Sequence, residues 1–207
     1  RYEKFDWEYS GTYVSGLSAD GTQILRGANR QIEDTKGINL DTRLAGEVET
    51  GGMIHRLLFG LDIRQFDANA TTEFYTGTPL AWANPVRGSV PAGPAWYTAI
   101  SDIKQRQIGL YVQDEIEVGN WRGTVALRHD WAKQTGTKYT NFAGTNGIDQ
   151  SDQETTGHVG LGYRFDNGMM PYVSYSASFD PVIGIDENGD TMKPMRATSW
   201  EAGLKYE

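Results

Sequence analysis

Apolar and polar residues alternate one by one along several stretches of this chain. The clearest case is the pair of runs 104–118 and 121–134, which are joined by a Gly-Asn dipeptide. In the second run, Leu127 has the opposite parity from Arg128 and Asp130. Because the side chains of a strand point alternately to its two faces, each run predicts a strand with one apolar and one charged face. Together they predict a hairpin.

The same alternation recurs along the rest of the chain. It predicts further strands at 1–13, 37–49, 53–66, 155–165, 171–179 and 198–206. The total is about eight antiparallel strands, each near the length that crosses a bilayer when the strand is tilted. The predicted fold class is therefore all-β.

The connections between these strands are of two kinds. Tight turns are predicted at 50–52, 119–120 and 166–169, and long polar loops near 14–36, 67–103, 135–153 and 180–196. Short periplasmic turns and long extracellular loops are typical of a transmembrane β-barrel of the outer membrane. The apolar parity would then face lipid, and the charged parity a wet lumen or an inserted domain. A soluble sandwich with one solvated face is the alternative.

Composition agrees with an all-β chain rich in turns. Aromatic residues make up 12% and glycine counts 25, although only 38% of the residues are hydrophobic. Many aromatic residues lie near strand ends, where interfacial girdles of a barrel are found: Trp121, Trp131, Tyr163, Phe165, Tyr175, Phe179, Trp200 and Tyr206. The net charge of -8, without a basic stripe, argues against a nucleic-acid partner. Both chain ends read as interrupted strands, so we expect an excerpt of a longer protein.

No arrangement of residues predicts an enzyme, a metal site or a cofactor. His55, His129 and His158 lie on separate predicted strands without metal-ligand spacing. The segment "DENGDT" (186–191) lacks the glycine and the closing glutamate of a calcium loop. Carboxylates are plentiful, but no pair stands out as an acid and a base.

Several motifs carry a resemblance to a known family. They are "RQIGLYVQDEIEVGNWRGTVALRHDWAKQ", "FDNGMMPYVSYSASFDP" and "EAGLKY". They resemble the barrel of TonB-dependent ferric-siderophore receptors, with the ferrichrome-iron (hydroxamate) type the most similar. The resemblance extends over essentially all 207 residues. It implies an outer-membrane barrel of about 22 strands, plugged by an N-terminal domain. Residues 1–207 would supply about eight of these strands, with the plug outside the chain.

The resemblance also implies a function. Such a receptor binds a ferric hydroxamate siderophore and imports it by active transport, driven by the TonB-ExbB-ExbD complex through the plug. By residue match, Phe74 and Tyr13 fall at ligand-contact positions, with Tyr9 as the substitute for Tyr13. A further tyrosine of the family is replaced here by Ser15, which leaves the identity of the siderophore open.

Bottom-up reasoning adds further aromatic candidates near Phe74. Tyr75 is adjacent to it and is a candidate ligand residue. Trp82, Trp96 and Tyr97 belong to the same predicted loop, where we expect them to form a small private core rather than a lid over the ligand. Two other functions stay open: a small structural outer-membrane barrel or adhesin, and a soluble β enzyme.

Overall fold

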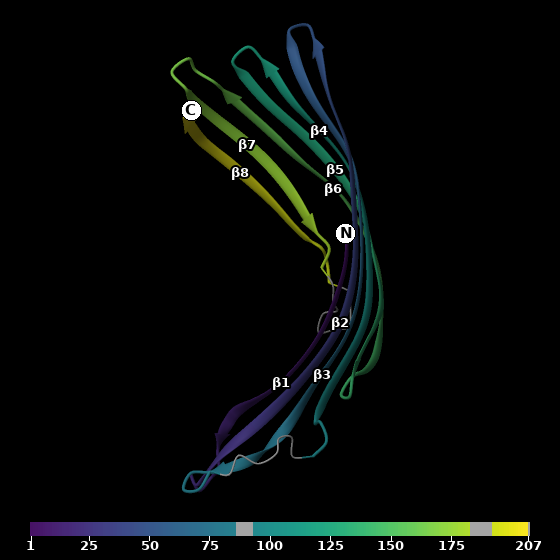
Figure 1. Cartoon of the computed structure of the whole chain (residues 1–207), viewed down its shortest axis with the longest axis vertical. Coiled ribbons are helices and arrows are strands. Elements are labelled where there is room, and N and C mark those ends of the chain that lie inside the picture. The colour runs from purple at the N-terminus through teal and green to yellow at the C-terminus, as the bar shows by residue number, and fades with distance from the viewer. Residues whose placement is uncertain (86–92, 183–191, 207) are drawn as a thin grey trace.

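The chain folds into one curved antiparallel sheet. The structure is a computed structural model that describes residues 1–85, 93–182 and 192–206. Eight strands lie side by side in sequence order: β1 Tyr2–Leu17, β2 Gln23–Thr50, β3 Met53–Ala81, β4 Tyr97–Val118, β5 Trp121–Thr140, β6 Gly144–Tyr163, β7 Met169–Asp180 and β8 Met195–Tyr206. Figure 1 shows them as a bowed wall, with β1 and β8 at its two edges. The predicted all-β antiparallel fold is confirmed.

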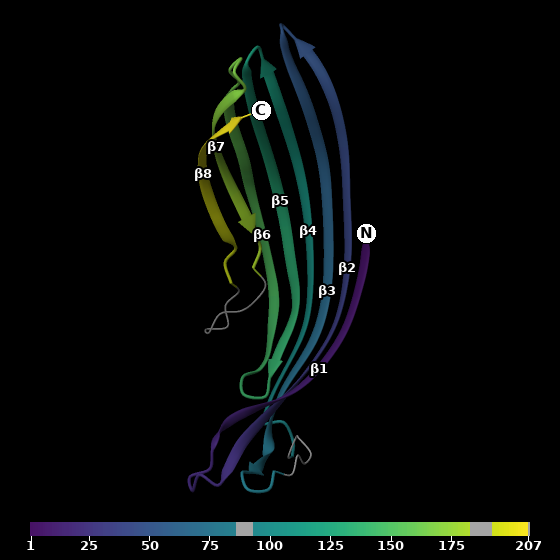
Figure 2. The same cartoon turned by 60° about the vertical axis from the view of Figure 1, so that its left-hand side comes forward.

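The wall has the shape of a section cut from a barrel. Figure 2 shows from a second side that the strands are long, bowed and inclined together, so that the sheet has a concave and a convex face. A twisted sheet whose strands are inclined together can close into a barrel. No helix in the described ranges is long and apolar enough to span a membrane.

The three predicted tight turns lie together at one end of the sheet, at the top of Figure 1. Glycines with positive φ make these turns possible: Gly51 at 60°, Gly119 at 54° and Gly168 at 84°. In the last turn the Asn167 side chain also accepts a hydrogen bond of 3.1 Å from the amide of Met169. The glycine-containing sequences that predicted these turns therefore form them for the expected reason, which is that glycine tolerates positive φ.

The boundaries predicted for the long loops were wrong. Strand β2 begins at Gln23, β3 runs to Ala81 and β6 begins at Gly144, so most of the intervals 14–36, 67–103 and 135–153 is strand. Beyond the bilayer, water or polar groups meet both faces of a strand, and the alternation fades while the hydrogen-bonded ladder continues. The segment 186–191, which was rejected as a calcium loop, lies outside the described residues.

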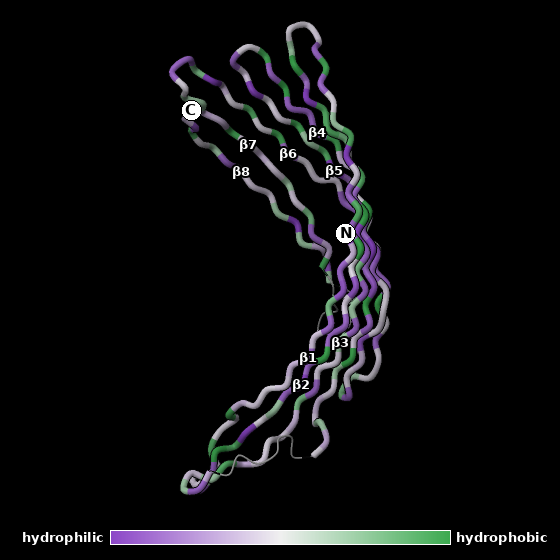
Figure 3. The backbone as a smooth tube through the Cα atoms, in the orientation of Figure 1, coloured by the Kyte–Doolittle hydropathy of each residue, from purple (hydrophilic) through white to green (hydrophobic). Residues whose placement is uncertain are grey.

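Strand pairing assigns every residue to one of the two faces. From Arg26 onward, β2 pairs with β3 without a register shift, and the pairings of β3 with β4, β4 with β5 and β5 with β6 have none. Paired residues therefore share a face. One face carries an apolar band about eleven residues tall on β3, which suits a bilayer crossed at a tilt. Its large side chains are exposed: Leu40, Leu44, Phe59, Leu110, Leu127, Val159, Val173 and Trp200. Figure 3 shows the alternation of hydrophobic and hydrophilic residues along neighbouring strands.

The opposite face is charged and better packed. Asp62 and Asp130 belong to it and are only 7% and 3% exposed, whereas Leu44 and Trp200 on the apolar face are 71% and 75% exposed. Exposed apolar and buried charged side chains are the reverse of a soluble protein's distribution. This distribution is expected of a barrel wall whose apolar face is turned outward, and we call the charged face the inner face.

One ionisable pair interrupts the apolar band. Asp114 shares this face with Val112 and lies 2.8 Å from Nδ1 of His55 on the neighbouring strand. Both side chains are 23% exposed. A charge at this depth is costly in lipid unless it is paired, so the pairing explains how Asp114 is accommodated. At the tight-turn end, the Tyr163 ring contacts both Trp121 and Phe165 edge to face, as expected of an interfacial girdle.

Candidate functional site

Aromatic side chains gather on the inner face, beyond the level of the apolar band. The register of β1 with β2 is unbroken from Tyr2 to Val14, and that of β3 with β4 from Met53 to Phe74. Parity therefore assigns one set of rings to the inner face, which we call the aromatic wall: Phe5, Trp7, Tyr9, Tyr13, Phe66, Phe74 and Tyr97. The wall brings together three of the four residues predicted to contact the ligand.

The rings of Tyr9 and Tyr13 each lie over a glycine of the sheet. A methyl group on Gly11 would collide with the Tyr9 hydroxyl, and one on Gly27 would collide with the Tyr13 ring. Because such contacts are not tolerated, glycine at these two positions lets each ring lie flat against the strand. The rings thus present a broad apolar surface to the lumen.

Phe74 approaches the same region from β3. It is two strands away from Gly11, with Asn29 of β2 in register between them. Its ring centroid is 5.8 Å from those of both Trp96 and Tyr97. These contacts fix the ring from the side of β4, and Asn29 supplies a polar group between the aromatic faces of Tyr9 and Phe74.

The private core predicted for the β3–β4 connection forms in part. The rings of Trp96 and Tyr97 pack at 6.1 Å, and Tyr97 contacts Phe142 at 5.9 Å. Trp82 is 60% exposed and makes no ring contact within the described part of the chain. The cluster includes Phe74, so it buttresses the candidate site rather than standing apart from it.

Tyr75 lies on the other face of β3. It has the opposite parity from Phe74, and its hydroxyl donates a 2.7 Å hydrogen bond to Glu73. That carboxylate, which also contacts Arg30 at 4.0 Å, raises the pKa of Tyr75. Tyr75 therefore points away from the aromatic wall. Its adjacency to Phe74 in sequence was misleading because neighbours on a strand face opposite ways.

Trp7 is a member of the wall that sequence reasoning missed. Its ring stacks on Tyr9 with an interplanar angle of 8° and a centroid distance of 5.8 Å. The signal was present in "FDWEY", where Phe5, Trp7 and Tyr9 alternate with acidic residues. An aromatic parity on a barrel strand predicts a lipid-facing side, but β1 lies beyond the level of the apolar band and its aromatic parity faces inward.

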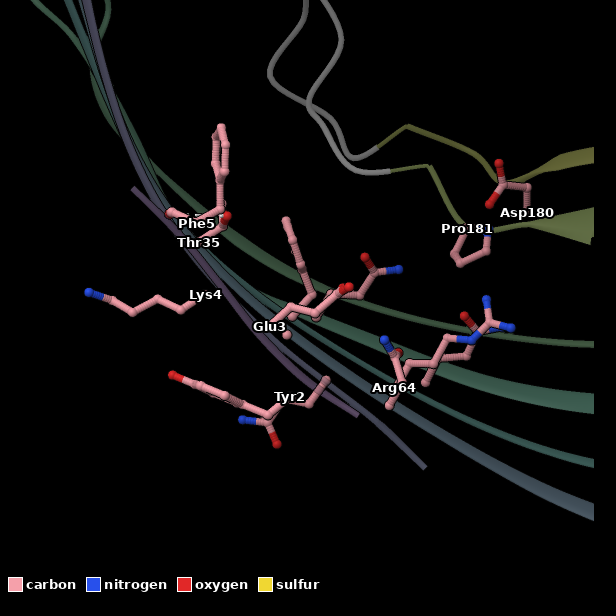
Figure 4. A pocket seen from close by; sticks show the side chains of 14 residues that line it. Tyr2, Glu3, Lys4, Phe5, Thr35, Arg64, Asp180 and Pro181 are labelled. Carbon is pink, nitrogen blue, oxygen red and sulfur yellow. Dashed lines mark hydrogen bonds between the residues drawn. The ribbon is translucent and has the colours of Figure 1, made fainter. Parts of the chain in front are cut away.

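A cavity of about 910 Å³ lies on the inner face next to the aromatic wall. Phe5 and Phe66 line it, together with polar residues such as Thr35 and Gln107. Figure 4 shows Phe5 and Arg64 on the side of the sheet that faces Asp180 and Pro181 at the end of β7, with Lys4 and Tyr2 pointing the other way. Tyr9, Tyr13 and Phe74 do not line this cavity; they lie farther along the strands.

Two glutamines hold the stems of the β7–β8 connection against the inner face. Gln134, which is 1% exposed, donates a 3.2 Å hydrogen bond to the carbonyl of Val182. Gln150 donates one of 2.9 Å to the carbonyl of Met192. These anchors draw both stems inward, so Val182 and Met192 border the same lumen as the cavity.

The arrangement is suited to gripping a compact ligand from outside. It supplies flat aromatic faces, amide and hydroxyl groups, and a roomy cavity, which together are typical of a small-molecule site. A metal ion whose coordination sites are all filled by a chelator would need no ligand from the protein. The aromatic wall is suited to binding such a complex through the surface of the chelator.

Comparison with known proteins identifies the architecture. The family model "TonB dependent receptor-like, beta-barrel" matches residues 1–207. The chain belongs to this family. The ferrioxamine B receptor of Salmonella typhimurium is 38% identical over 187 residues, which are 90% of this chain and 26% of that receptor. The ferrichrome outer membrane transporter/phage receptor of Escherichia coli K12 is 33% identical over 183 residues, 84% of this chain and 24% of that protein.

A solved structure supports the same fold. The siderophore receptor PiuA of Acinetobacter baumannii superimposes with a TM-score of 0.75 at 18% identity, over 99% of this chain and 34% of that one. The chain spans about a quarter of the length of the curated relatives it matches. Membership of the family places this chain in the bacterial outer membrane, and the members of the family are receptors and transporters rather than enzymes.

Proposed function

We propose that this chain is part of an outer-membrane receptor that binds a ferric hydroxamate siderophore and imports it by TonB-coupled active transport. The observation that carries the proposal is the convergence of Tyr9, Tyr13 and Phe74 on one inner face. Similarity to the ferrioxamine B receptor and the ferrichrome transporter supports the same ligand class.

The chemistry of the wall fits such a ligand. A ferric hydroxamate is compact, carries no large negative charge, and has its iron coordination filled. Flat rings and the amide of Asn29 can hold the organic shell by dispersion and hydrogen bonds. A ferric catecholate is an anion and would need arginine or lysine side chains around it. Within the described residues, the inner-face positions of β1, β2 and β3 around the aromatic wall carry none beyond the level of Arg64.

The partners proposed for the whole protein follow from the same assignment. A plug domain outside residues 1–207 would pack against the charged inner face and contact TonB, which is energised by ExbB and ExbD. Lipid of the outer membrane would cover the apolar band. The arginine and aspartate side chains of the inner face, among them Arg128 and Asp62, offer polar groups for such an inserted domain.

Affinity measurements on the purified full-length receptor test the proposal. Phe74→Ala should weaken binding of a ferric hydroxamate by about tenfold, because it removes one wall of a pocket that has several. Tyr75→Ala is the matched control: it removes an aromatic ring one residue away on the other face and should leave affinity unchanged. Equal effects of the two variants, or tight binding of a ferric catecholate alone, would overturn the assignment.

The alternative function, a structural barrel or adhesin without transport, makes a different prediction. A protein of that kind would show no saturable binding of any ferric siderophore. Its aromatic wall would serve only to stiffen the extracellular hairpins, and Phe74→Ala would then lower stability while leaving nothing to measure in affinity.

A further inference from the structure

A single carboxylate stands beside the stacked rings of the aromatic wall. Glu33 of β2 is paired in register with Trp7 on one side and with Ala70 of β3 on the other, so all three side chains share the inner face. We propose that Glu33 and Trp7 form a subsite for a positively charged group of the ligand, an alkylammonium, and select a cationic ferric hydroxamate over a neutral one. This inference rests on the proposed function.

The carboxylate of Glu33 lacks a partner among the described residues. It is half-buried, and no hydrogen bond or ion pair joins it to any of them. The nearest acidic neighbour on the same face, Glu3, is already paired with Arg1. Half-buried charges are normally paired, so Glu33 has the character of a group that awaits a cation.

The surrounding charge favours a cation as well. Beyond the level of Arg64 and its partner Asn39, the inner-face positions of β1, β2 and β3 carry no lysine or arginine within the described ranges. In the same region Lys4, Arg30 and Lys36 all have the outward parity. Arg64 itself is paired with Asp62 at 3.1 Å. This part of the lumen therefore has a negative potential that nothing on the wall cancels.

The neighbouring rings supply the second element of a cation site. Trp7, which stacks on Tyr9, keeps 38% of its surface exposed. Residues that pair directly across a sheet have Cβ atoms about 5 Å apart, so an ammonium on Glu33 would also lie within reach of the indole face. The small side chain of Ala70 on the other side leaves room for the arm that carries the charge.

Lys138 is the cation that shares this row of the sheet. It is linked to Glu33 through the paired residues Ala70 and Ser101, three strands away. At the usual strand spacing its backbone is about 14 Å from that of Glu33. At this distance Lys138 does not neutralise the Glu33 carboxylate. The body of a bound ligand would lie between Lys138 and the ammonium group at Glu33.

Two probes that differ only in charge test this inference on the purified full-length receptor. One is a linear ferric trihydroxamate that ends in a primary amine, and the other is the same complex with that amine acetylated. The wild-type receptor should bind the amine form about tenfold more tightly. Glu33→Gln should abolish this preference by weakening the amine form alone, and Trp7→Leu should reduce it.

The control and the contrary outcomes are well separated. Glu8→Gln removes a carboxylate next to Trp7 in sequence but on the outward face, where it pairs with Arg30 at 2.9 Å, and should keep the preference. Equal wild-type affinity for the two probes, or a preference that survives in Glu33→Gln, would overturn the subsite and leave the proposed function standing. Failure of the wild type to bind either probe would overturn the proposed function itself.

Discussion

Arg128 joins two strands of the inner face through two carboxylates. Its guanidinium lies 3.1 Å from Asp62 on β3 and 2.7 Å from Asp130 on its own strand. Gln107 donates a further 2.9 Å hydrogen bond to Asp130. Both carboxylates are almost fully buried, and the arginine supplies a cation that pairs with them there.

Replacing this arginine should therefore be costly. Arg128→Met leaves Asp130 without its cation and Asp62 with Arg64 alone. It should destabilise the full-length barrel by about 2–4 kcal/mol, a range lowered because Arg128 is partly exposed. Arg43→Met, which removes a more exposed arginine paired with Asp41 on the same face, should cost much less. Denaturant unfolding of the purified receptor measures both, and equal losses would contradict the role given to Arg128.

The level of the bilayer can be tested on a single face of β3. Leu61→Arg places a charge inside the apolar band and should destabilise by about 2–4 kcal/mol. Thr71→Arg puts the same side chain on the same face ten residues farther on, beyond the band, and should be close to neutral. Stability of the receptor refolded into lipid vesicles decides the matter. A sheet that is not embedded in lipid would tolerate the two substitutions alike.

The orientation of the sheet predicts which ends a reagent can reach. A cysteine at Asn84, in the β3–β4 connection, should react with a membrane-impermeant maleimide on intact cells that express the full-length receptor. A cysteine at Asn120, in a tight turn at the other end, should react only after the outer membrane is opened. Both residues are exposed, so accessibility from outside is the only difference between them. The reverse labelling pattern would show that the barrel has the opposite orientation in the membrane.

The glycine seats of the tyrosines offer a test that leaves every ring in place. Gly27→Ala should push the Tyr13 ring from its position and weaken hydroxamate binding by about as much as Tyr13→Ala does, some threefold to tenfold. Gly37→Ala lies on the same strand and face, with its nearest atom 4.0 Å away, and should bind as the wild type does. Isothermal titration compares the three, and normal affinity in Gly27→Ala would remove Tyr13 from the site.

The sequence predicted the fold well inside the apolar band and poorly beyond it. Inside the band, alternation of residues such as Leu61 and Asp62 located the strands and their two faces, and glycine chemistry located the tight turns. Beyond the band, β3 carries only polar residues and alanine over residues 67–72, so the alternation of large apolar and polar side chains was lost and the strand lengths were underestimated. Pairing over long distances, such as His55 with Asp114 or Arg128 with Asp62, depends on register that the sequence pattern does not reveal.

The candidate site shows the same division. Phe74 and Tyr13 were reached through resemblance to a family, and the parity that unites them with Tyr9 required an unbroken strand register. That register also separated Tyr75 from Phe74. The functional meaning of Trp7 and Glu33 could not be read from the sequence. It required the register that places β1 and the paired residues 24–38 of β2 beyond the apolar band, with Trp7 and Glu33 on the inner face.

Uptake of iron by living cells tests the central claim most directly. Cells that lack their own hydroxamate receptors and express the full-length protein should accumulate radioactive iron supplied as a ferric hydroxamate, and should lose this uptake when TonB is deleted. Iron supplied as a ferric catecholate should not enter through this protein. Hydroxamate uptake that persists without TonB, or the entry of catecholate iron alone, would contradict the account.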